Sequence, residues 1–312
     1  MTPEIAVVIP TRGREPRVAF ALEALAAQSL QRDRYEVIVV RDADAPERLA
    51  PVPDAAPVRY VTSPRVSGPV AKRNLGWRAT GARLVAFTDD DCRPAPDWLA
   101  RLLEADRGEA AFLQGRTEPD PSERHLLYGL ARSVQVVGPS DWYETCNIAY
   151  PRALLERLGG FDEAFEQVGD DTDLGLRARA AGARRIYVDR ARVWHAVLPR
   201  TLPAAIRETS RFGTAALMIA RHPEHRRVLY GRLFLRPSHA RLALAFAGAL
   251  SRRPLVAALA ALPYADPYGS WHRLPPRTLA RELVHLPARA TVDLAELIAT
   301  VRGAVRYRSP LI

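Results

Sequence analysis

Short runs of consecutive hydrophobic residues alternate with stretches of helical periodicity over the first two thirds of the chain. Each run is four or five residues long, is mostly aliphatic, and borders on a proline, a charged residue or a turn. These runs predict buried strands at residues 5–9, 36–40, 58–61, 84–87, 110–114 and 185–188. Apolar residues spaced three and four apart predict helices at residues 18–30, 70–80, 151–158 and 171–181 and directly after Trp98.

Strands that alternate with helices in this way are typical of βαβ units. The pattern therefore predicts an α/β fold with a mainly parallel sheet flanked by helices. In such sheets, ligands bind beyond the carboxyl ends of the strands. Polar side chains fall at three of those ends, at Thr11, at Asp42 and at residues 89–91.

Beyond His195 the pattern becomes helical and is interrupted by prolines. We expect a ligand-binding domain at residues 1–198 and a basic, helical C-terminal region at residues 199–312 that packs on it. The longest uncharged stretches of this tail, residues 242–250 and 255–264, are far shorter than the ~20 residues of a membrane-spanning helix.

Composition excludes several classes of protein and makes the charge distribution informative. The 312 residues are 48% hydrophobic and 26% charged, which argues against a disordered, collagen-like or disulfide-scaffold chain. The net charge is +10, but residues 1–195 carry 27 basic and 29 acidic residues (−2), whereas residues 196–312 carry 18 and 6 (+12). The basicity therefore belongs to the tail, and we expect no nucleic-acid partner. Two cysteines are too few for a disulfide framework, which favours the reducing cytoplasm.

Two acidic clusters are the strongest candidates for chemistry. Three adjacent carboxylates at residues 89–91 repel one another and raise one another's pKa unless a cation or a donor-rich ligand compensates them. Oxygen ligands suit Mg²⁺ or Mn²⁺, and these ions suit a diphosphate. A second cluster at residues 170–173 opens a predicted helix, where capping explains one or two acids better than three.

The order of these features resembles the family 2 glycosyltransferases with the GT-A fold. The resemblance covers residues 4–196 and rests on the segments IAVVIPTRGR (5–14), YEVIVVRDAD (35–44), GPVAKRNLGWRATGARLVAFTDDDCRPAPDWL (68–99), CNIAYPRALLERLGGFDEAF (146–165), GDDTDLGLRARAAGAR (169–184) and VWH (193–195). It implies a Rossmann-like sheet and an inverting transfer of a sugar from a nucleotide-diphosphate sugar to an acceptor hydroxyl.

The resemblance also implies which residues hold the donor nucleotide. Thr11, Arg12 and Asp42 match the positions that hold the base. The helix after Gly68-Pro69 carries the family's Arg-Asn pair, here Arg73-Asn74, which faces the nucleotide, and Lys72, the one lysine of the chain, precedes it.

The remaining positions concern the sugar, the metal and the proton. Asp89 and Asp90 match carboxylates that lie toward the ribose, and we group Asp170 with them as a nucleotide-sugar ligand. Asp91 and His195 match ligands of a divalent ion, Mn²⁺ or Mg²⁺, that bridges the diphosphate. Asp171 matches the general base. Such a transfer needs a base for the acceptor proton, a cation at the leaving group and correct positioning.

Two other functions and several roles for the tail stay open. A sugar nucleotidyltransferase would share a nucleotide-binding sheet, and a non-catalytic carbohydrate- or membrane-binding scaffold would keep the fold alone. The acceptor is a glycan, a lipid-linked molecule or a small molecule. The arginine-rich tail is a structural cap or a peripheral membrane-binding surface at the inner face of the cell membrane, since apolar helix faces with basic flanks bind anionic lipid.

Overall fold

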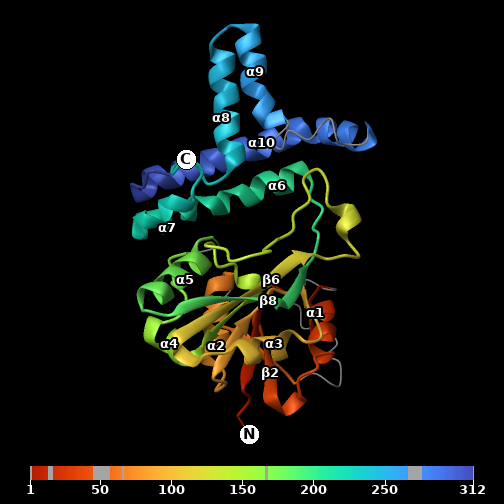
Figure 1. Cartoon of the computed structure of the whole chain (residues 1–312), viewed down its shortest axis with the longest axis vertical. Coiled ribbons are helices and arrows are strands. Elements are labelled where there is room, and N and C mark those ends of the chain that lie inside the picture. Colours follow the sequence, from red (N-terminus) through yellow and green to blue (C-terminus); the bar gives the residue numbers. More distant parts are fainter. Residues whose placement is uncertain are drawn as a thin grey trace. The chain divides into compact units, whose positions relative to one another are not determined.

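The computed structural model describes residues 2–12, 17–44, 57–64, 67–165, 168–265 and 276–311 (Figure 1). It divides into two compact units. The first, called the sheet unit, consists of Met1–Arg124 and Ser133–Val197. The second, called the helical unit, consists of His125–Arg132 and Leu198–Ile312.

A single mixed sheet forms the centre of the sheet unit. Its eight described strands lie in the order β3-β2-β1-β4-β7-β6-β8-β5. Four pairs of neighbouring strands are parallel: β1 with β2, β1 with β4, β2 with β3, and β6 with β8. The other three pairs are antiparallel: β4 with β7, β6 with β7, and β5 with β8. The strands are β1 (Ile5–Pro10), β2 (Tyr35–Asp42), β3 (Val58–Ser63), β4 (Leu84–Phe87), β5 (Cys92–Pro94), β6 (Ala111–Pro119), β7 (Ile148–Pro151) and β8 (Arg184–His195).

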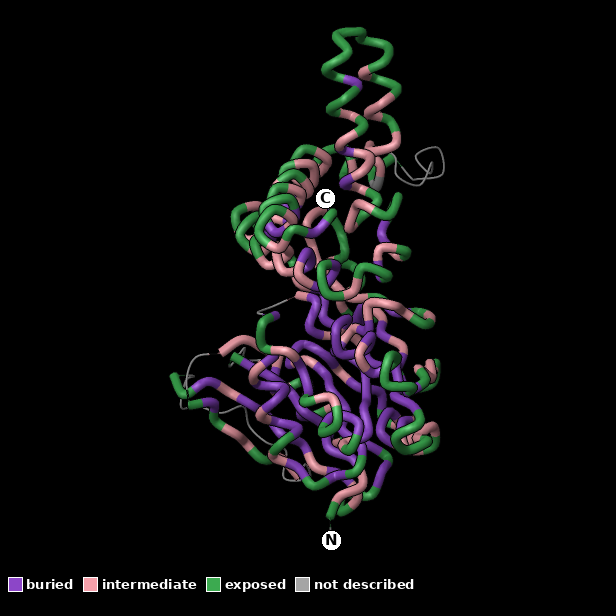
Figure 2. Tube along the Cα trace, turned by 90° about the vertical axis from the view of Figure 1, so that its left-hand side faces the viewer, coloured by how far each residue is buried: buried purple, intermediate pink, exposed green. Residues whose placement is uncertain are grey.

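Helices cover both faces of β1, which explains why all six of its residues are buried. Buried residues gather in the interior of the sheet unit (Figure 2). α1 (Arg17–Ala26) and α3 (Trp98–Ala105) pack on the face that carries Ile5, Val7 and Ile9. α2 (Pro69–Arg78) lies on the opposite face, and it approaches so closely that a Cβ on Gly76 would come within 2.3 Å of Val8 Cγ1. α4 (Arg152–Leu158) and α5 (Asp170–Ala180) complete the unit.

The predicted strands and helices of the sheet unit are confirmed, with several differences at their ends. α1 stops at Ala26, and the strand expected at residues 185–188 extends to His195. The two antiparallel strands β5 and β7 were not predicted. Each is only three or four residues long and carries a proline, so neither stands out as a hydrophobic run.

Asn147 stabilises the sheet where the pairing of β6 with β8 is irregular. The pairing of β6 with β8 shifts register between Gly115 and Arg116. There the buried Asn147 amide donates hydrogen bonds to Arg116 O (2.8 Å) and Ala191 O (2.9 Å) and accepts one from Trp98 Nε1 (2.9 Å). One side chain thus joins both strands of the bulge to α3.

Helices make up most of the helical unit. Its α-helices are α6 (Leu202–Glu208), α7 (Ala215–Arg221), α8 (Pro237–Leu250), α9 (Pro254–Ala265) and α10 (Pro276–Tyr307). α8 and α9 lie side by side as an antiparallel hairpin that projects from α10 (Figure 1). Among the described residues, no helix is both long enough and apolar enough to cross a membrane.

We expect Asn147→Ala to lower the free energy of unfolding by about 2–4 kcal/mol, because it leaves buried backbone carbonyls and the Trp98 indole without partners. Urea denaturation followed by near-ultraviolet circular dichroism measures the change. Gln31→Ala, at an exposed position with no side-chain cap bond, is the control and should shift stability by less than about 0.5 kcal/mol. Equal stabilities of the two variants would contradict the role given to Asn147.

Candidate functional site

The carboxyl ends of β2, β1 and β4 bring the sequence-predicted polar residues to one edge of the sheet. Asp42 is the last residue of β2, Thr11 follows β1, and residues 89–91 follow β4. These three strands are parallel neighbours, so the segments that leave them lie next to one another. α2 adds two cations to the same edge from the side.

Lys72 is a buried cation that joins two of these segments. Its ammonium group donates hydrogen bonds to Asp42 Oδ2 (2.6 Å) and to Thr11 O (2.8 Å). Asp42 Oδ1 also accepts a bond from Ser67 N (2.9 Å). Burial raises the pKa of the Asp42 carboxyl, but the bonds from Lys72 and Ser67 outweigh burial and hold that pKa below its usual range. The Asp42 carboxyl is therefore ionised and holds Lys72 and the backbone at Ser67 in place.

A second contact links the ends of β1 and β4. Thr11 Oγ1 donates a 2.7 Å hydrogen bond to Asp90 Oδ2, and both residues are buried. Arg12, the next residue, is exposed. Its positive charge lowers the pKa of Asp42 slightly, as the last of several causes. Residues 11 and 12 thus bring a buried hydroxyl and an exposed guanidinium to the end of β1.

Arg73 bridges the two acidic clusters. One terminal nitrogen of its guanidinium lies 2.9 Å from Asp89 Oδ1 and the other 3.0 Å from Asp170 Oδ2. Its Nε is buried and has no hydrogen-bond partner among the described residues. Lys72 and Arg73, which are adjacent on α2, therefore offset the negative charge of the neighbouring carboxylates. The sequence alone did not show which groups compensate that charge.

Asp171 has a carboxyl whose surroundings raise its pKa. It lies at the start of α5, is partly exposed, and accepts a hydrogen bond from Thr172 N (2.8 Å). Burial raises the pKa of Asp171 well above its usual value, and the negative charges of Asp170 and Glu144 raise it further. A carboxylate with a raised pKa that keeps contact with solvent is suited to accepting a proton.

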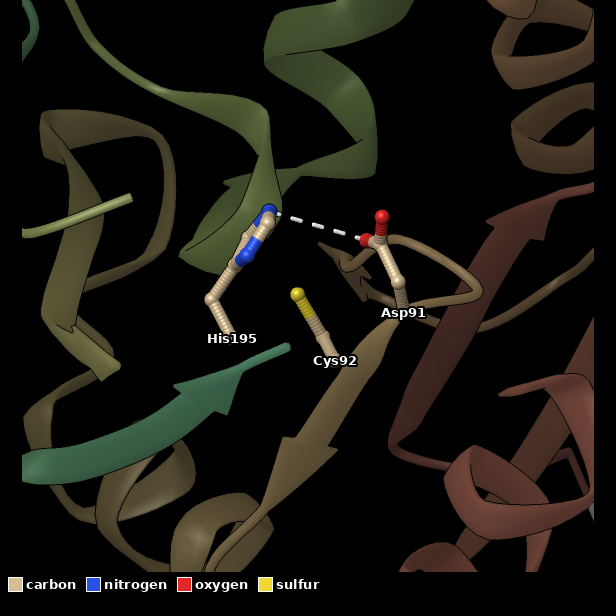
Figure 3. A group of neighbouring side chains, drawn as sticks. All are labelled: Asp91, Cys92 and His195. Atoms are coloured by element: carbon tan, nitrogen blue, oxygen red, sulfur yellow. Dashed lines mark ion pairs between the residues drawn. The ribbon is translucent and has the colours of Figure 1, made fainter. Parts of the chain in front are cut away.

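Asp91 and His195 face each other across β5 and β8 (Figure 3). His195 Nε2 lies 3.6 Å from Asp91 Oδ1. On the other side of the ring, Nδ1 lies 2.8 Å from Ala196 O. A proton on Nδ1 would be donated to that carbonyl, which leaves the lone pair of Nε2 directed at Asp91.

Cys92 lies beside this pair, and one ligand atom from each of the three residues falls within 4.8 Å of the others. The three residues could therefore hold one metal ion, with a carboxylate oxygen and an imidazole nitrogen among its ligands. Burial raises the pKa of the Cys92 thiol well above its usual value, so at neutral pH the thiol is protonated.

One residue of the site, Asn74, differs from the expectation based on the sequence, and another, Glu144, was not expected. Asn74 was expected to face the nucleotide with Arg73, but both ends of its amide bind protein: Nδ2 donates to Phe161 O (2.8 Å), and Oδ1 accepts from Trp77 Nε1 (3.0 Å). Asn74 thereby fixes the segment that precedes α5. Glu144, which acts on Asp171, was missed because it lies in a stretch without clear periodicity.

The structure brings the expected residues together as three adjoining groups in the sheet unit. The first consists of Thr11, Asp42, Lys72 and Asp90, the second of Arg73, Asp89, Asp170 and Asp171, and the third of Asp91 and His195. Arg12 lies beside the first. The roles of these residues stay predictions.

Two sequence models of known families match the chain. The model described as glycosyl transferase family 2 matches residues 6–153, and the one described as glycosyl transferase family group 2 matches residues 84–271. The second match covers more than half of the chain and includes the acidic clusters and His195.

Curated relatives carry glycosyltransferase names. The chain is 27% identical over 220 residues to validoxylamine A glucosyltransferase of Streptomyces hygroscopicus subsp. limoneus, a match that covers 58% of this chain and 49% of that protein. It is 30% identical to pre-mycofactocin glycosyltransferase of Mycobacterium tuberculosis, covering 71% of this chain and 48% of the relative. An uncharacterized glycosyltransferase of Bacillus subtilis, YwdF, is 33% identical, covering 56% of this chain and 68% of YwdF. The chain thus spans about half the length of the first two.

A solved structure confirms the fold. The mannosyltransferase PcManGT from Pyrobaculum calidifontis, in complex with GDP-Man and Mn²⁺, matches with a TM-score of 0.58 at 23% identity and covers 94% of this chain and 88% of its own. The S. aureus protein TarS (residues 1–349), in complex with UDP-GlcNAc, matches with a TM-score of 0.51 at 16% identity, over 99% of this chain and 93% of that chain. The expected α/β arrangement of the GT-A type is therefore confirmed.

We expect Lys72→Met to lower the free energy of unfolding at pH 7 by about 3–5 kcal/mol, because Asp42 is left buried without its cation. The pKa of Asp42 is depressed in the folded state, so the stability gained from its ionisation is present above the unfolded pKa near 3.8 and is lost as pH falls through the lower folded pKa. The stability gap between wild type and variant should accordingly shrink as pH falls below about 4.

Chemical denaturation between neutral and acidic pH measures that gap. The double variant Asp42→Asn/Lys72→Met is the control, and it should recover most of the loss because no uncompensated charge remains. A gap that is independent of pH, or a double variant as unstable as Lys72→Met, would show that the ion pair is not what stabilises this edge.

Proposed function

The chain belongs to glycosyl transferase family 2, and on this premise we propose that it transfers a sugar from a nucleotide-diphosphate sugar to an acceptor hydroxyl with inversion at the anomeric carbon. The single observation that supports this most directly is the junction at Arg73. One buried guanidinium holds the acidic cluster that follows β4 next to the one that opens α5. Donor-binding and proton-accepting carboxylates are thereby kept within reach of one substrate.

In this proposal the donor nucleotide lies over the carboxyl ends of β1, β2 and β4. Asp42, held ionised by Lys72, accepts hydrogen bonds from the base, and Thr11 and Arg12 line the same side. Asp89 and Asp90 lie toward the ribose, and Arg73 and Asp170 toward the diphosphate and the sugar. GDP-Man in PcManGT and UDP-GlcNAc in TarS support a donor of this class.

Asp91 and His195 would hold a divalent metal ion, Mn²⁺ or Mg²⁺. When bound, the ion would offset the negative charge that develops on the departing diphosphate. The chain prepares the site in two ways. The Nδ1 contact with Ala196 O orients the imidazole, and the β5–β8 pairing fixes the distance between the two side chains. The Mn²⁺ in PcManGT supports this assignment.

Asp171 would act as the general base. Its raised pKa makes its carboxylate a stronger proton acceptor than an ordinary aspartate, and its partial exposure leaves it accessible to an acceptor hydroxyl. As that hydroxyl attacks the anomeric carbon, its proton passes to Asp171, and the bond from the anomeric carbon to the diphosphate oxygen breaks. The acceptor would be a glycan, a lipid-linked molecule or a small molecule.

We expect Asp171→Asn to reduce kcat by about 10²–10⁴-fold while donor affinity stays within a few-fold of wild type, because only proton transfer is lost. The wild-type rate should fall as pH decreases through the raised pKa of Asp171, at a higher pH than an ordinary aspartate would give, and the variant should lack this limb. Initial rates against pH, with donor binding by calorimetry, measure both effects.

Asp33→Asn, at an exposed carboxylate outside the three groups, is the matched control and should retain wild-type kcat and pH dependence. If Asp171→Asn keeps full activity, the base is another group or the chain is a scaffold that retains the fold.

A donor screen tests the donor class and the metal together. Thermal unfolding with UDP-, GDP- and dTDP-sugars, each with Mn²⁺ or Mg²⁺, should give a metal-dependent rise in Tm for one nucleotide. In Asp91→Ala, that metal-dependent rise should disappear, because one of the two protein ligands is removed. An undiminished Mn²⁺ effect in this variant would refute the metal assignment. Formation of nucleotide sugar from a sugar 1-phosphate and a nucleoside triphosphate would instead identify a nucleotidyltransferase.

A further inference from the structure

The α8–α9 hairpin of the helical unit exposes an unusual amount of hydrophobic surface. Leu250 is 82% exposed, Leu255 72% and Leu259 57%, and Leu244, Phe246 and Leu262 are each about half exposed. Exposed positions occur along both helices and at the tip between them (Figure 2). Scattered exposed leucines are ordinary on a protein surface, but a continuous cluster of them marks a surface that binds something.

The apolar character of the hairpin extends around both helices. From residue 244 to residue 262, every exposed residue is Ala, Val, Leu, Phe or Pro except the three at the tip, Ser251, Arg252 and Arg253. A helix that packs on a protein core from water normally carries a polar outer face, so the apolar outer surface of this hairpin points to a further apolar partner. The two helices pack on each other where Gly248 lies against Val256, Ala257 and Ala260, and α9 has no fully buried residue.

The charges of the hairpin identify the kind of partner. Pro237–Ala265 contains no acidic residue, and its charged side chains are Arg241, Arg252 and Arg253. The chain from residue 196 onward carries 18 basic and 6 acidic residues. Basic side chains beside an apolar surface match the anionic headgroups and acyl chains of a phospholipid leaflet.

The lengths of the helices determine how the hairpin can meet a membrane. α8 and α9 contain 14 and 12 residues, fewer than the ~20 that cross the hydrocarbon core. Insertion with the tip first would place Arg252 and Arg253 deep in the hydrocarbon, where an arginine is unfavourable. A hairpin that lies along the interface avoids this, because its leucines enter the acyl region while its arginines reach the phosphates.

We propose that the α8–α9 hairpin binds the surface of an anionic phospholipid membrane by lying in the interface. The arginines contact lipid phosphates, and Leu250, Leu255 and Leu259 enter the acyl region. The alternative occupant is the hairpin of a second copy of the chain. The lack of acidic residues speaks against it, since such a pair would bring arginines together without counter-charges. This proposal does not depend on sugar transfer, because membrane binding is measured without any substrate.

Flotation of the full-length protein with vesicles of phosphatidylcholine, with and without one quarter phosphatidylglycerol, tests the proposal. Wild type should float with the anionic vesicles. Leu250→Glu/Leu255→Glu should lower the partition coefficient at least about 100-fold, since each exposed leucine buried in the acyl region contributes about 1.5 kcal/mol. Arg252→Gln/Arg253→Gln should lower it roughly 30-fold on anionic vesicles, because each basic residue near such a surface contributes about 1 kcal/mol.

The matched control is Leu127→Glu/Val137→Glu, which changes two exposed aliphatic residues outside the hairpin and alters the net charge equally. It should bind vesicles within about twofold of wild type. Far-ultraviolet circular dichroism of each variant verifies that the helices are retained. The proposal is overturned if wild type does not float, or if the control loses as much binding as the hairpin variant. It is also overturned if light scattering finds a dimer that only Leu250→Glu/Leu255→Glu dissociates while wild type ignores vesicles.

A depth measurement distinguishes the interface from ordinary surface attraction. Both native cysteines are buried, so Leu259→Cys can be labelled selectively with an environment-sensitive fluorophore. Its emission should shift to shorter wavelength on anionic vesicles and keep that shift at high salt once bound. An unshifted emission on bound vesicles would mean that the arginines bind alone, which contradicts insertion of the leucines.

Discussion

Lys72 and Arg73 are consecutive residues of α2 whose charged ends both enter the acidic edge of the sheet, and the rest of the site depends on this pair of buried cations. Carboxylates from the ends of β2 and β4 and from the start of α5 converge there, and without compensation they would repel one another or become protonated. Lys72 offsets the charge at the end of β2 and Arg73 that between β4 and α5. The site is therefore electrostatically assembled before any ligand arrives.

Two further residues of α2 place those cations. Gly76 lets the helix lie directly on β1, because any larger side chain would meet Val8. Asn74 binds the backbone at Phe161 and so holds the segment that precedes α5 against α2. Residues of α2 thus set the distance between this helix and the sheet, hold the segment before α5, and place both positive charges at the acidic edge. A substitution at Gly76 or Asn74 would therefore shift Lys72 and Arg73 relative to the acidic clusters.

The sequence predicts the parallel half of the sheet well and the antiparallel half poorly. β1, β2 and β4 are continuous apolar runs because helices bury both of their faces, whereas β5 contains only Cys92, Arg93 and Pro94. The acidic positions could be found from their place after strands or at the start of a helix, but their partners could not. That Arg73 joins Asp89 to Asp170 depends on residues 97 positions apart in the chain. How the helical tail packs on the sheet unit stays a prediction.

The pairing of β5 with β8 has a consequence for how such a site can change over evolutionary time. Cys92 is paired with His195, and Ala196 N donates a hydrogen bond to Asp91 O, so backbone pairing fixes the spacing between the imidazole and the carboxylate. A slip of one residue would turn His195 to the other face of the sheet. An insertion or deletion of one residue in β5 or β8 would therefore separate the Asp91–His195 pair even where both residues are retained.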